Sequence, residues 1–358
     1  MKLINLDRCA PATTSGPSPG MTVRFTEPDE FAASIQDHTM DILVLGDRAQ
    51  FRATITYSAL KRLRLQRGTE SCPRVGHTVT SNTRVIVTFL ANVLRSSPLV
   101  GVRNSGNVIS VHGPGHAYSR HSIGPVIWCT VSLPTEVFIE AVWALTGKEV
   151  VPAPGAGGRF YTDSTALQHL RYLHAASLEL ALMNPHVLAD QHVASGLESA
   201  LIHVIATCVT GAVEPPMSAG ERRHRQAIDR FERTLARMPM EPLYLSDICA
   251  AIGVSARTME YCCREYYGMG PNRYLRLRRM NQAHRALIEA NADKISVTDV
   301  AMRFGFWELG RFASAYRILF AETPSATLRR SRSMSSAVLS AAASSSSIGM
   351  HSVAAECA

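Results

Sequence analysis

Residues 297–330 read VTDVAMRFGFWELGRFASAYRILFAETPSATLRR, a helix-forming stretch that is interrupted in its middle. Val297, Val300, Ala301 and Phe304 recur with the spacing of one helix face. Gly305 can adopt the left-handed conformation that ends a helix, and the Phe after it can fill the corner. The apolar pattern then resumes with Leu309, Phe312, Tyr316 and Leu319. The stretch therefore predicts a helix, a short turn and a second helix.

The same pattern occurs once more, 52 residues earlier in the chain. Residues 245–254, LSDICAAIGV, repeat the apolar spacing and the terminal Gly followed by an apolar residue. Ser246-Asp247 and Thr298-Asp299 each suit a helix N-terminus, and Ser255 can cap the helix that follows the first break. The match resumes at a shift of 53, where GMGPNRYLR (268–276) aligns with AETPSATLR (321–329). The sequence thus predicts two helix–turn–helix units.

A helix of about 271–290 is predicted between the two units, opened by Pro271. Twenty residues at a rise of about 1.5 Å span roughly 30 Å, and one turn of DNA is about 34 Å. A rigid spacer of this length would place both second helices in successive major grooves on one face of DNA.

The charge of the chain is confined to the same region. Residues 221–332 contain 20 Lys and Arg against 12 Asp and Glu, whereas the rest of the chain contains 17 of each. All of the net charge of +8 therefore lies in the last third, which favours a polyanionic partner for that third. A basic solvated surface on an all-α bundle is the alternative.

Residues 224–330 resemble the DNA-binding domain of AraC/XylS-type bacterial transcription regulators. The resemblance rests on LSDICAAIGVSARTM, GMGPNRYL, RRMNQAHRAL, VAMRFGF and FASAYRILFAETPSATLRR. It implies an N-terminal domain that senses a ligand or dimerises and that is often a cupin-like β-barrel followed by helices. The chain departs from the family where Ala321 replaces a usual Gly, Ser314 a frequent Arg and Gly310 a Ser. The second recognition helix is therefore expected to position phosphates more than to read bases.

The resemblance assigns DNA contacts to particular residues. Base-reading residues are expected at Arg257, Glu260, Tyr261, Glu308 and Ser314, and phosphate contacts at Arg264, Arg273, Arg276, Arg311 and Arg317. Arg257 could donate two hydrogen bonds to guanine, and Glu260 could accept one from cytosine. Arg278 is a further phosphate candidate, while Trp307 and Leu309 are weaker candidates that can instead pack at the turn and on the inward stripe. The alternative for each of these residues is a side chain that is solvated at the surface or packed in the core.

The first part of the chain reads as β-rich. Strands are expected at 51–59, 60–66, 84–90, 99–102, 107–112 and 125–133, followed by helices at about 134–146, 163–183 and 185–210. The predicted class is an α+β multidomain protein. Its predicted parts are a disordered tail 1–20, a β-rich regulatory domain 21–160, a helical pair 161–212 that forms core or a dimer seam, a linker 213–223, the DNA-binding domain 224–330 and a Ser/Ala-rich disordered tail 331–358.

No metal or cofactor site is expected. The eight cysteines form no C-x-x-C pair, and the loop histidines His112, His116 and His121 have no acid nearby. No catalytic residue is predicted and no nucleophile elbow is found, so an enzyme is not expected. The absence of an 18-residue apolar run and of a signal peptide predicts a cytoplasmic protein without a membrane span.

The predicted function is a sequence-specific transcription regulator that binds double-stranded DNA. Activation is the commoner outcome in the resembling family, and RNA polymerase, a small-molecule effector and a homodimer partner are compatible with it. The effector-binding residues are not identified by the sequence. Two alternatives remain at this stage, which are an enzyme with a DNA-targeting C-terminal module and a non-specific architectural DNA binder.

Overall fold

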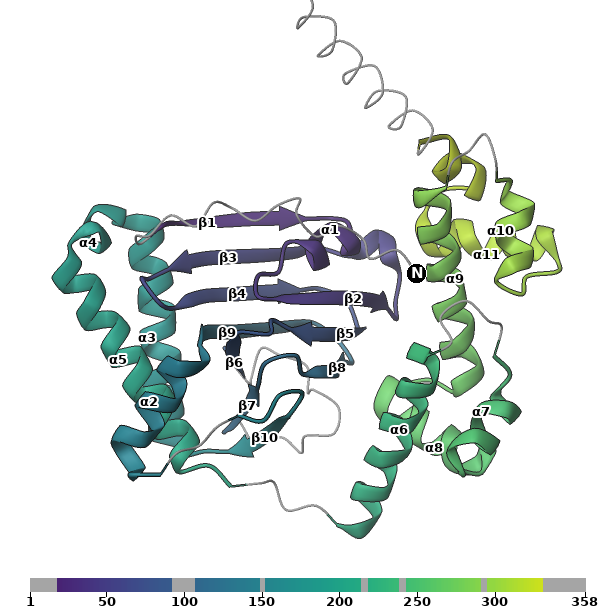
Figure 1. The fold of residues 1–358 in the computed structure, drawn as a ribbon. Coiled ribbons are helices and arrows are strands. Elements are labelled where there is room, and N and C mark those ends of the chain that lie inside the picture. Colours follow the sequence, from purple (N-terminus) through teal and green to yellow (C-terminus); the bar gives the residue numbers. More distant parts are fainter. Residues whose placement is uncertain are drawn as a thin grey trace, which may run out of the picture. The chain divides into compact units, whose positions relative to one another are not determined.

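The computed structural model describes residues 18–91, 107–148, 152–213, 218–237, 243–290 and 295–330. The chain divides into two compact units, one of residues 18–46 and 50–222 and the other of residues 47–49 and 223–330. The first unit is β-rich and the second is helical, so the predicted α+β multidomain class is confirmed (Figure 1).

Two antiparallel sheets form the first unit. The larger has the strand order β1-β3-β4-β9-β6-β7-β10, and the smaller has the order β2-β5-β8. Their strands are β1 (Ser18–Phe25), β2 (His38–Val44), β3 (Ala53–Ala59), β4 (Arg64–Glu70), β5 (Arg74–Thr80), β6 (Arg84–Leu90), β7 (Val108–His112), β8 (Ala117–Ser122), β9 (Val126–Pro134) and β10 (Gly157–Tyr161). A short helix α1 (Pro28–Ala33) completes this part, whereas most of the 3-10 turn η1 (Arg48–Gln50) is assigned to the other unit.

Helices cover one face of the large sheet (Figure 1). These are α2 (Thr135–Thr146), α3 (Ser164–Met183), α4 (Pro185–Ala189) and α5 (Gln191–Thr210). Alternate strand residues such as Val87 and Val131 pack with Leu170 of α3 and Leu201 of α5 in one core. The predicted stripe of 197, 201, 204, 205 and 208 belongs to this core, which favours the core role left open for the helical pair. Among the described residues, α5 alone has the length and apolarity of a membrane span.

A second core lies between the two sheets at the α1 end. Phe31 of α1 packs edge-on against Trp128 of β9 and Phe51, with Ile42 of β2 and Ile55 of β3 in the same cluster. These side chains come from both sheets, so the two sheets face each other as a sandwich.

Several expected elements differ in detail. The chain over 60–63 is a turn in which Leu60 N–H donates to the Leu63 carbonyl, and the strand begins only at Arg64. The helix predicted at 185–210 is two helices, because the Asp190 carboxylate caps a new helix by accepting from His192 N–H. Strand β1 starts at Ser18, inside the predicted tail 1–20. The strand expected at 99–102 lies outside the described residues.

The helical unit contains α6 (Ala219–Arg237), α7 (Leu245–Ile252), α8 (Ala256–Tyr267), α9 (Pro271–Glu289), α10 (Val297–Arg303) and α11 (Leu309–Phe320). Residues 324–330 are also helical. The predicted pairs α7–α8 and α10–α11 and the spacer α9 are therefore present, and the turn-then-helix order is confirmed for both.

Candidate nucleic-acid interface

The two turns have the same hydrogen-bond geometry. At the first, Val254 N–H donates to the Cys249 carbonyl at 3.0 Å and Gly253 N–H to the Ala250 carbonyl at 3.3 Å. At the second, the same two bonds recur 52 residues later at 2.9 and 3.0 Å. Gly253 and Gly305 have φ of 67° and 75°, which only glycine adopts freely. This pairing of bonds is the Schellman ending of a helix, so both breaks are built in one way.

Hydroxyl groups cap the starts of α8 and α10, although only the first at the predicted residue. Ser255 accepts from Thr258 N–H at 3.1 Å, as expected for α8. At α10 the cap is Ser296 rather than Thr298, because the Ser296 hydroxyl accepts from Asp299 N–H while the Asp299 carboxylate accepts from Ser296 N–H. This reciprocal capping box satisfies two amide groups at once. No side chain caps α7, so the predicted role of Ser246 there is wrong.

Each helix–turn–helix is held against α9 by buried aromatic rings. Tyr267 of α8 stacks on Tyr274 of α9 with centroids 4.2 Å apart, and the Glu232 carboxylate of α6 accepts from both hydroxyls. In the second helix–turn–helix, Phe304, Phe312 and Tyr316 pack with Met280 and Leu287 of α9. The phenylalanines are core residues, as their spacing predicts, and α9 joins the two units into one domain.

Burial makes the thiols of the first helix–turn–helix unreactive. Cys249, Cys262 and Cys263 are buried free cysteines. Desolvation raises the pKa of the Cys262 thiol to about 11 and that of Cys263 further. These thiols therefore stay protonated at neutral pH and act as small apolar side chains.

Three predicted DNA contacts share the exposed face of α8. Met259, Cys262 and Cys263 are buried on one side of the helix, whereas Arg257, Tyr261 and Arg264 are exposed on the other. A guanidinium, a phenol and a second guanidinium on one open helix face can meet base edges and phosphates.

Glu260 lies at the side of that face and is already paired. Its carboxylate is 2.8 Å from the Arg264 guanidinium in an i,i+4 ion pair, and it is about half exposed. It also lies against Gly270, where a Cβ would be only 2.7 Å from a Glu260 oxygen. The structure therefore couples a predicted base reader to a predicted phosphate contact.

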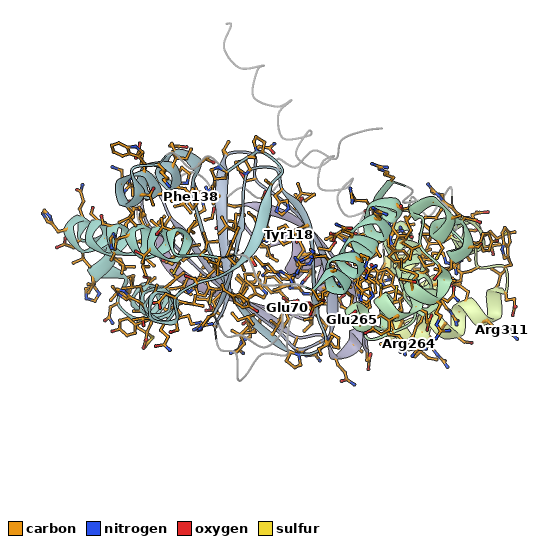
Figure 2. All side chains as sticks on the ribbon, turned by 90° about the horizontal axis from the view of Figure 1, so that it is seen from below. Glu70, Tyr118, Phe138, Arg264, Glu265 and Arg311 are labelled. Carbon is orange, nitrogen blue, oxygen red and sulfur yellow. The ribbon has the colours of Figure 1, made fainter. Side chains whose placement is uncertain are left out.

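Sequence reasoning missed a contact from α6. His224 Nδ1 is 3.2 Å from a Glu265 carboxylate oxygen, and its ring lies 5.0 Å from the Tyr261 ring. Both partners are on α8, so α6 steadies the helix that carries Arg264 and Glu265 (Figure 2). No local spacing in the sequence links 224 to 261 and 265, because the contact arises only from tertiary packing.

The second recognition helix presents a more apolar surface. Glu308, Arg311, Ser314 and Arg317 are all exposed, and Glu308 pairs with Arg311 at 2.8 Å. Leu309, placed on the inward stripe by its spacing, is instead exposed, because it is the first residue of α11 and lies beyond the core.

Two further apolar side chains lie on the same surface. Trp307 is 67% exposed, so it does not pack at the turn, which was the alternative considered for it. Ile318 is 78% exposed. The apolar residues beside Arg311 and Arg317 would allow contact with thymine methyl groups as well as with phosphates.

The spacer arginines separate into two kinds. Arg273 and Arg276 are exposed near the start of α9 and remain available for phosphate. Arg278 donates to the Leu235 carbonyl at 2.7 Å and so links α9 to α6. Arg278 therefore has a structural contact within the domain, and its phosphate role stays a prediction.

Comparisons with known proteins agree with this geometry. Residues 248–330 match a family model described as a helix-turn-helix domain. The chain is 35% identical over 105 residues to the probable thc operon regulatory protein of Rhodococcus erythropolis, a match that covers 29% of this chain and 30% of that protein. It is 29% identical over 141 residues to the XylDLEGF operon transcriptional activator 1 of Pseudomonas putida, covering 39% and 40%. The chain thus spans less than half the length of these curated relatives.

Two solved structures show a partial likeness to this chain. The AraC-like transcriptional activator CuxR aligns with a TM-score of 0.38 and 14% identity, covering 75% of this chain and 96% of that one. ToxT from Vibrio cholerae aligns with a TM-score of 0.27 and 10% identity, covering 82% and 98%.

Proposed function

Because residues 248–330 form a helix-turn-helix domain of the AraC/XylS type, we propose that this protein is a sequence-specific transcription regulator that binds double-stranded DNA. In this proposal α8 and α11 enter successive major grooves on one face of the duplex. The relatives named above as operon regulators and activators support the same role.

The repeated turn geometry is the observation that carries the proposal. The two Schellman helix endings have matching hydrogen bonds. They therefore give the second helix of each helix–turn–helix the same orientation relative to its first helix. The spacer α9 has 19 residues, which at about 1.5 Å each gives about 28 Å. That length approaches the roughly 34 Å of one DNA turn.

The two recognition helices are assigned different duties. Arg257, Glu260 and Tyr261 of α8 read bases, and Glu308 and Ser314 contribute fewer base contacts from the second unit. Arg264, Arg273, Arg276, Arg311 and Arg317 hold phosphates. The Glu260–Arg264 pair must open when the protein binds DNA, since its two members are assigned to different DNA groups.

The first unit is proposed to control the second. The β-sandwich carries either an effector site or a dimer contact, and the output is transcription activation through RNA polymerase in the cytoplasm. The protein acts by binding and not by catalysis.

Selection of genomic fragments by the purified full-length chain at physiological salt tests this function. We expect sharp enrichment of a few upstream sites that contain two sequence blocks about one helical turn apart. Uniform recovery with a steep salt dependence would instead identify a non-specific architectural binder and overturn the proposal.

A further inference from the structure

A polar row crosses the inner face of the large sheet in the first unit. Gln66 of β4 pairs with Thr130 of β9, which pairs with Thr88 of β6, which pairs with Ser110 of β7. All four are buried. His112 lies two residues beyond Ser110 on β7 and so shares this face. The space between two sheets is normally filled by apolar side chains, so this row departs from an ordinary sandwich core.

Several of these buried groups lack a hydrogen-bond partner. Among the described residues, nothing bonds to the hydroxyls of Thr88 and Thr130, to the Ser122 hydroxyl of β8 or to Nε2 of His112. Each of these residues is at most 5% exposed. A buried polar atom without a partner costs free energy, so native proteins rarely leave several together unless something else satisfies them.

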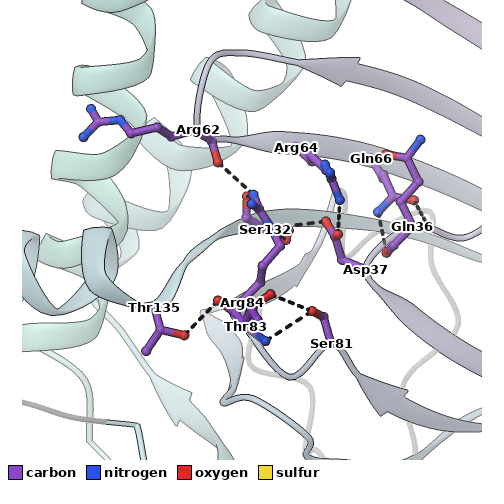
Figure 3. Close-up of polar contacts among 10 residues, drawn as sticks. All are labelled: Gln36, Asp37, Arg62, Arg64, Gln66, Ser81, Thr83, Arg84, Ser132 and Thr135. Carbon is purple, nitrogen blue, oxygen red and sulfur yellow. Dashed lines mark hydrogen bonds and ion pairs between the residues drawn. The ribbon is translucent and has the colours of Figure 1, made fainter. Parts of the chain in front are cut away.

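The buried carboxylates of this region are already engaged. Glu70 accepts two hydrogen bonds from Arg74, at 2.6 and 2.7 Å, and a third from the Trp128 indole at 2.6 Å. Asp37 lies between Arg64 and Arg84, as Figure 3 shows. Neither acid is left to neutralise a further cation.

Arg120 of β8 is that further cation. It lies two residues from Ser122, on the face of β8 that it shares with Tyr118, and it is only 8% exposed. In the described part of the chain, no acceptor receives a hydrogen bond from its guanidinium, whose central carbon lies 5.8 Å from the centroid of the Tyr118 ring. A guanidinium stays charged even when burial lowers its pKa, as it does here.

The neighbouring histidines add no compensating charge. Burial and the charge of Arg120 lower the pKa of His112 well below its usual value, and burial lowers that of His38 to about 4. Both are neutral at pH 7. The charges that act on Arg120 are therefore those of Arg74, which opposes its charge, and of Glu70, which is already bonded to Arg74 and Trp128.

A flat aromatic stack connects this cluster with solvent. The rings of His112 and Tyr118 are nearly parallel with centroids 3.8 Å apart, and His116 stacks beside them at 5.2 Å from His112. His112 is buried, whereas Tyr118 and His116 are partly exposed. Figure 2 marks Tyr118 and Glu70 among the side chains of this unit.

We propose that the inner cluster of Arg120, His112, Thr88, Thr130 and Ser122 is a binding site for a small organic acid. The carboxylate would pair with Arg120, the hydroxyls and His112 Nε2 would hydrogen-bond to its oxygen atoms, and its body would lie against the His112–Tyr118 stack. This assignment rests on the proposed function, because it identifies the chemical class of the effector.

The proposed site leads to a prediction about thermal stability that can be tested without a ligand. Arg120→Met replaces an unpaired buried charge by an apolar side chain of similar length, so the full-length chain should unfold at a temperature about 2–4 °C higher. Arg74→Met is the matched control on β5, the strand paired with β8 in the same sheet. It leaves Glu70 without its cation and should lower the unfolding temperature. A fall for Arg120→Met as well would overturn the proposal, because it would show that Arg120 has a structural partner.

The ligand class is tested with acetate, benzoate and decanoate, each paired with its neutral amide. At least one acid should raise the unfolding temperature of the wild type more than its amide does, and Arg120→Met should abolish the difference. An equal response of wild type and Arg120→Met to every acid, including no response, overturns the organic-acid site. Selective DNA binding measured on the same wild-type sample tells whether the regulator function survives such a result.

Discussion

The Tyr316 hydroxyl of α11 lies 2.6 Å from Nδ1 of His284 on α9, and both side chains are buried. The same hydroxyl is 2.8 Å from Oγ1 of Thr327 in the final helix. One buried polar group therefore fixes the second recognition helix to the spacer and to the end of the domain. The first recognition helix is fixed to α9 and α6 through Tyr267, Tyr274 and Glu232. The angle between the two recognition helices thus depends on buried hydrogen bonds as well as on apolar packing.

Removing the Tyr316 hydroxyl should weaken the domain. Tyr316→Phe keeps the ring but removes the hydrogen bonds of the hydroxyl to His284 and Thr327, which together should cost about 1–3 kcal/mol of unfolding free energy. Urea denaturation measures this loss. The control is Tyr244→Phe at a residue that is 67% exposed, where little change is expected. Equal stability of Tyr316→Phe and wild type would show that the hydroxyl is not needed.

Ala321 should be a site of easy stabilisation. It has φ of 57°, a left-handed conformation that is unfavourable for every residue with a Cβ. It occupies the position that Gly268 holds in the first helix–turn–helix. Ala321→Gly should therefore stabilise the domain by about 1 kcal/mol. The reverse change, Gly268→Ala, should destabilise it by a similar amount, since a Cβ there meets no other atom and only the backbone is strained. Opposite shifts in the two denaturation midpoints are the expected result.

The capping box at α10 should make the stability of the second helix–turn–helix depend on pH in the acid range. The Ser296 hydroxyl and then the Ser296 N–H lower the pKa of Asp299 by donating hydrogen bonds to its carboxylate. A depressed folded-state pKa adds stability above the unfolded-state pKa, and this stability is lost as the pH falls through the folded-state value. Ser296→Ala should cost about 1 kcal/mol at neutral pH. Its stability difference from wild type should shrink on acidification, as followed by circular dichroism between pH 7 and pH 2, and a difference that does not change with pH would contradict this role.

Arg257 and Arg311 should differ in what their loss does to DNA binding. Arg257→Ala should cost about 1–3 kcal/mol on the selected site and relax the preference at one base pair. Arg311→Ala should weaken binding to all duplexes alike and reduce the slope of affinity against salt by about one charge. Binding titrations on the site and on its single-base variants separate the two. An equal loss on every sequence for Arg257→Ala would remove its base-reading role.

Local signals explain why the helical unit could be predicted from the sequence. Its helix breaks depend on Gly253 and Gly305, and its cores on apolar residues at helical spacing, all of which act within one or two turns of the chain. The cap of α10 was misplaced because Thr298 and Ser296 offer equivalent hydroxyls, and only the backbone bend decides between them. The contact of His224 with Tyr261 and Glu265 has no such local signature.

The smaller sheet was missed for a different reason. Strands β2, β5 and β8 turn polar residues such as His38, Arg74 and Arg120 inward, so they lack the alternation of apolar and polar residues that marks an ordinary strand. Two of the inward polar residues of this sheet, Arg120 and Ser122 of β8, belong to the proposed organic-acid site. Failure of the local pattern and the presence of a binding site thus have one physical cause.

The central claim is that α8 and α11 read successive major grooves on one face of DNA. The most direct test measures the affinity of the full-length chain for its selected two-block site and for the same site with five base pairs inserted between the blocks. Five base pairs add about half a helical turn, which moves one block to the opposite face of the duplex. The account predicts that affinity falls to the level of a single block, whereas undiminished affinity after the insertion would contradict it.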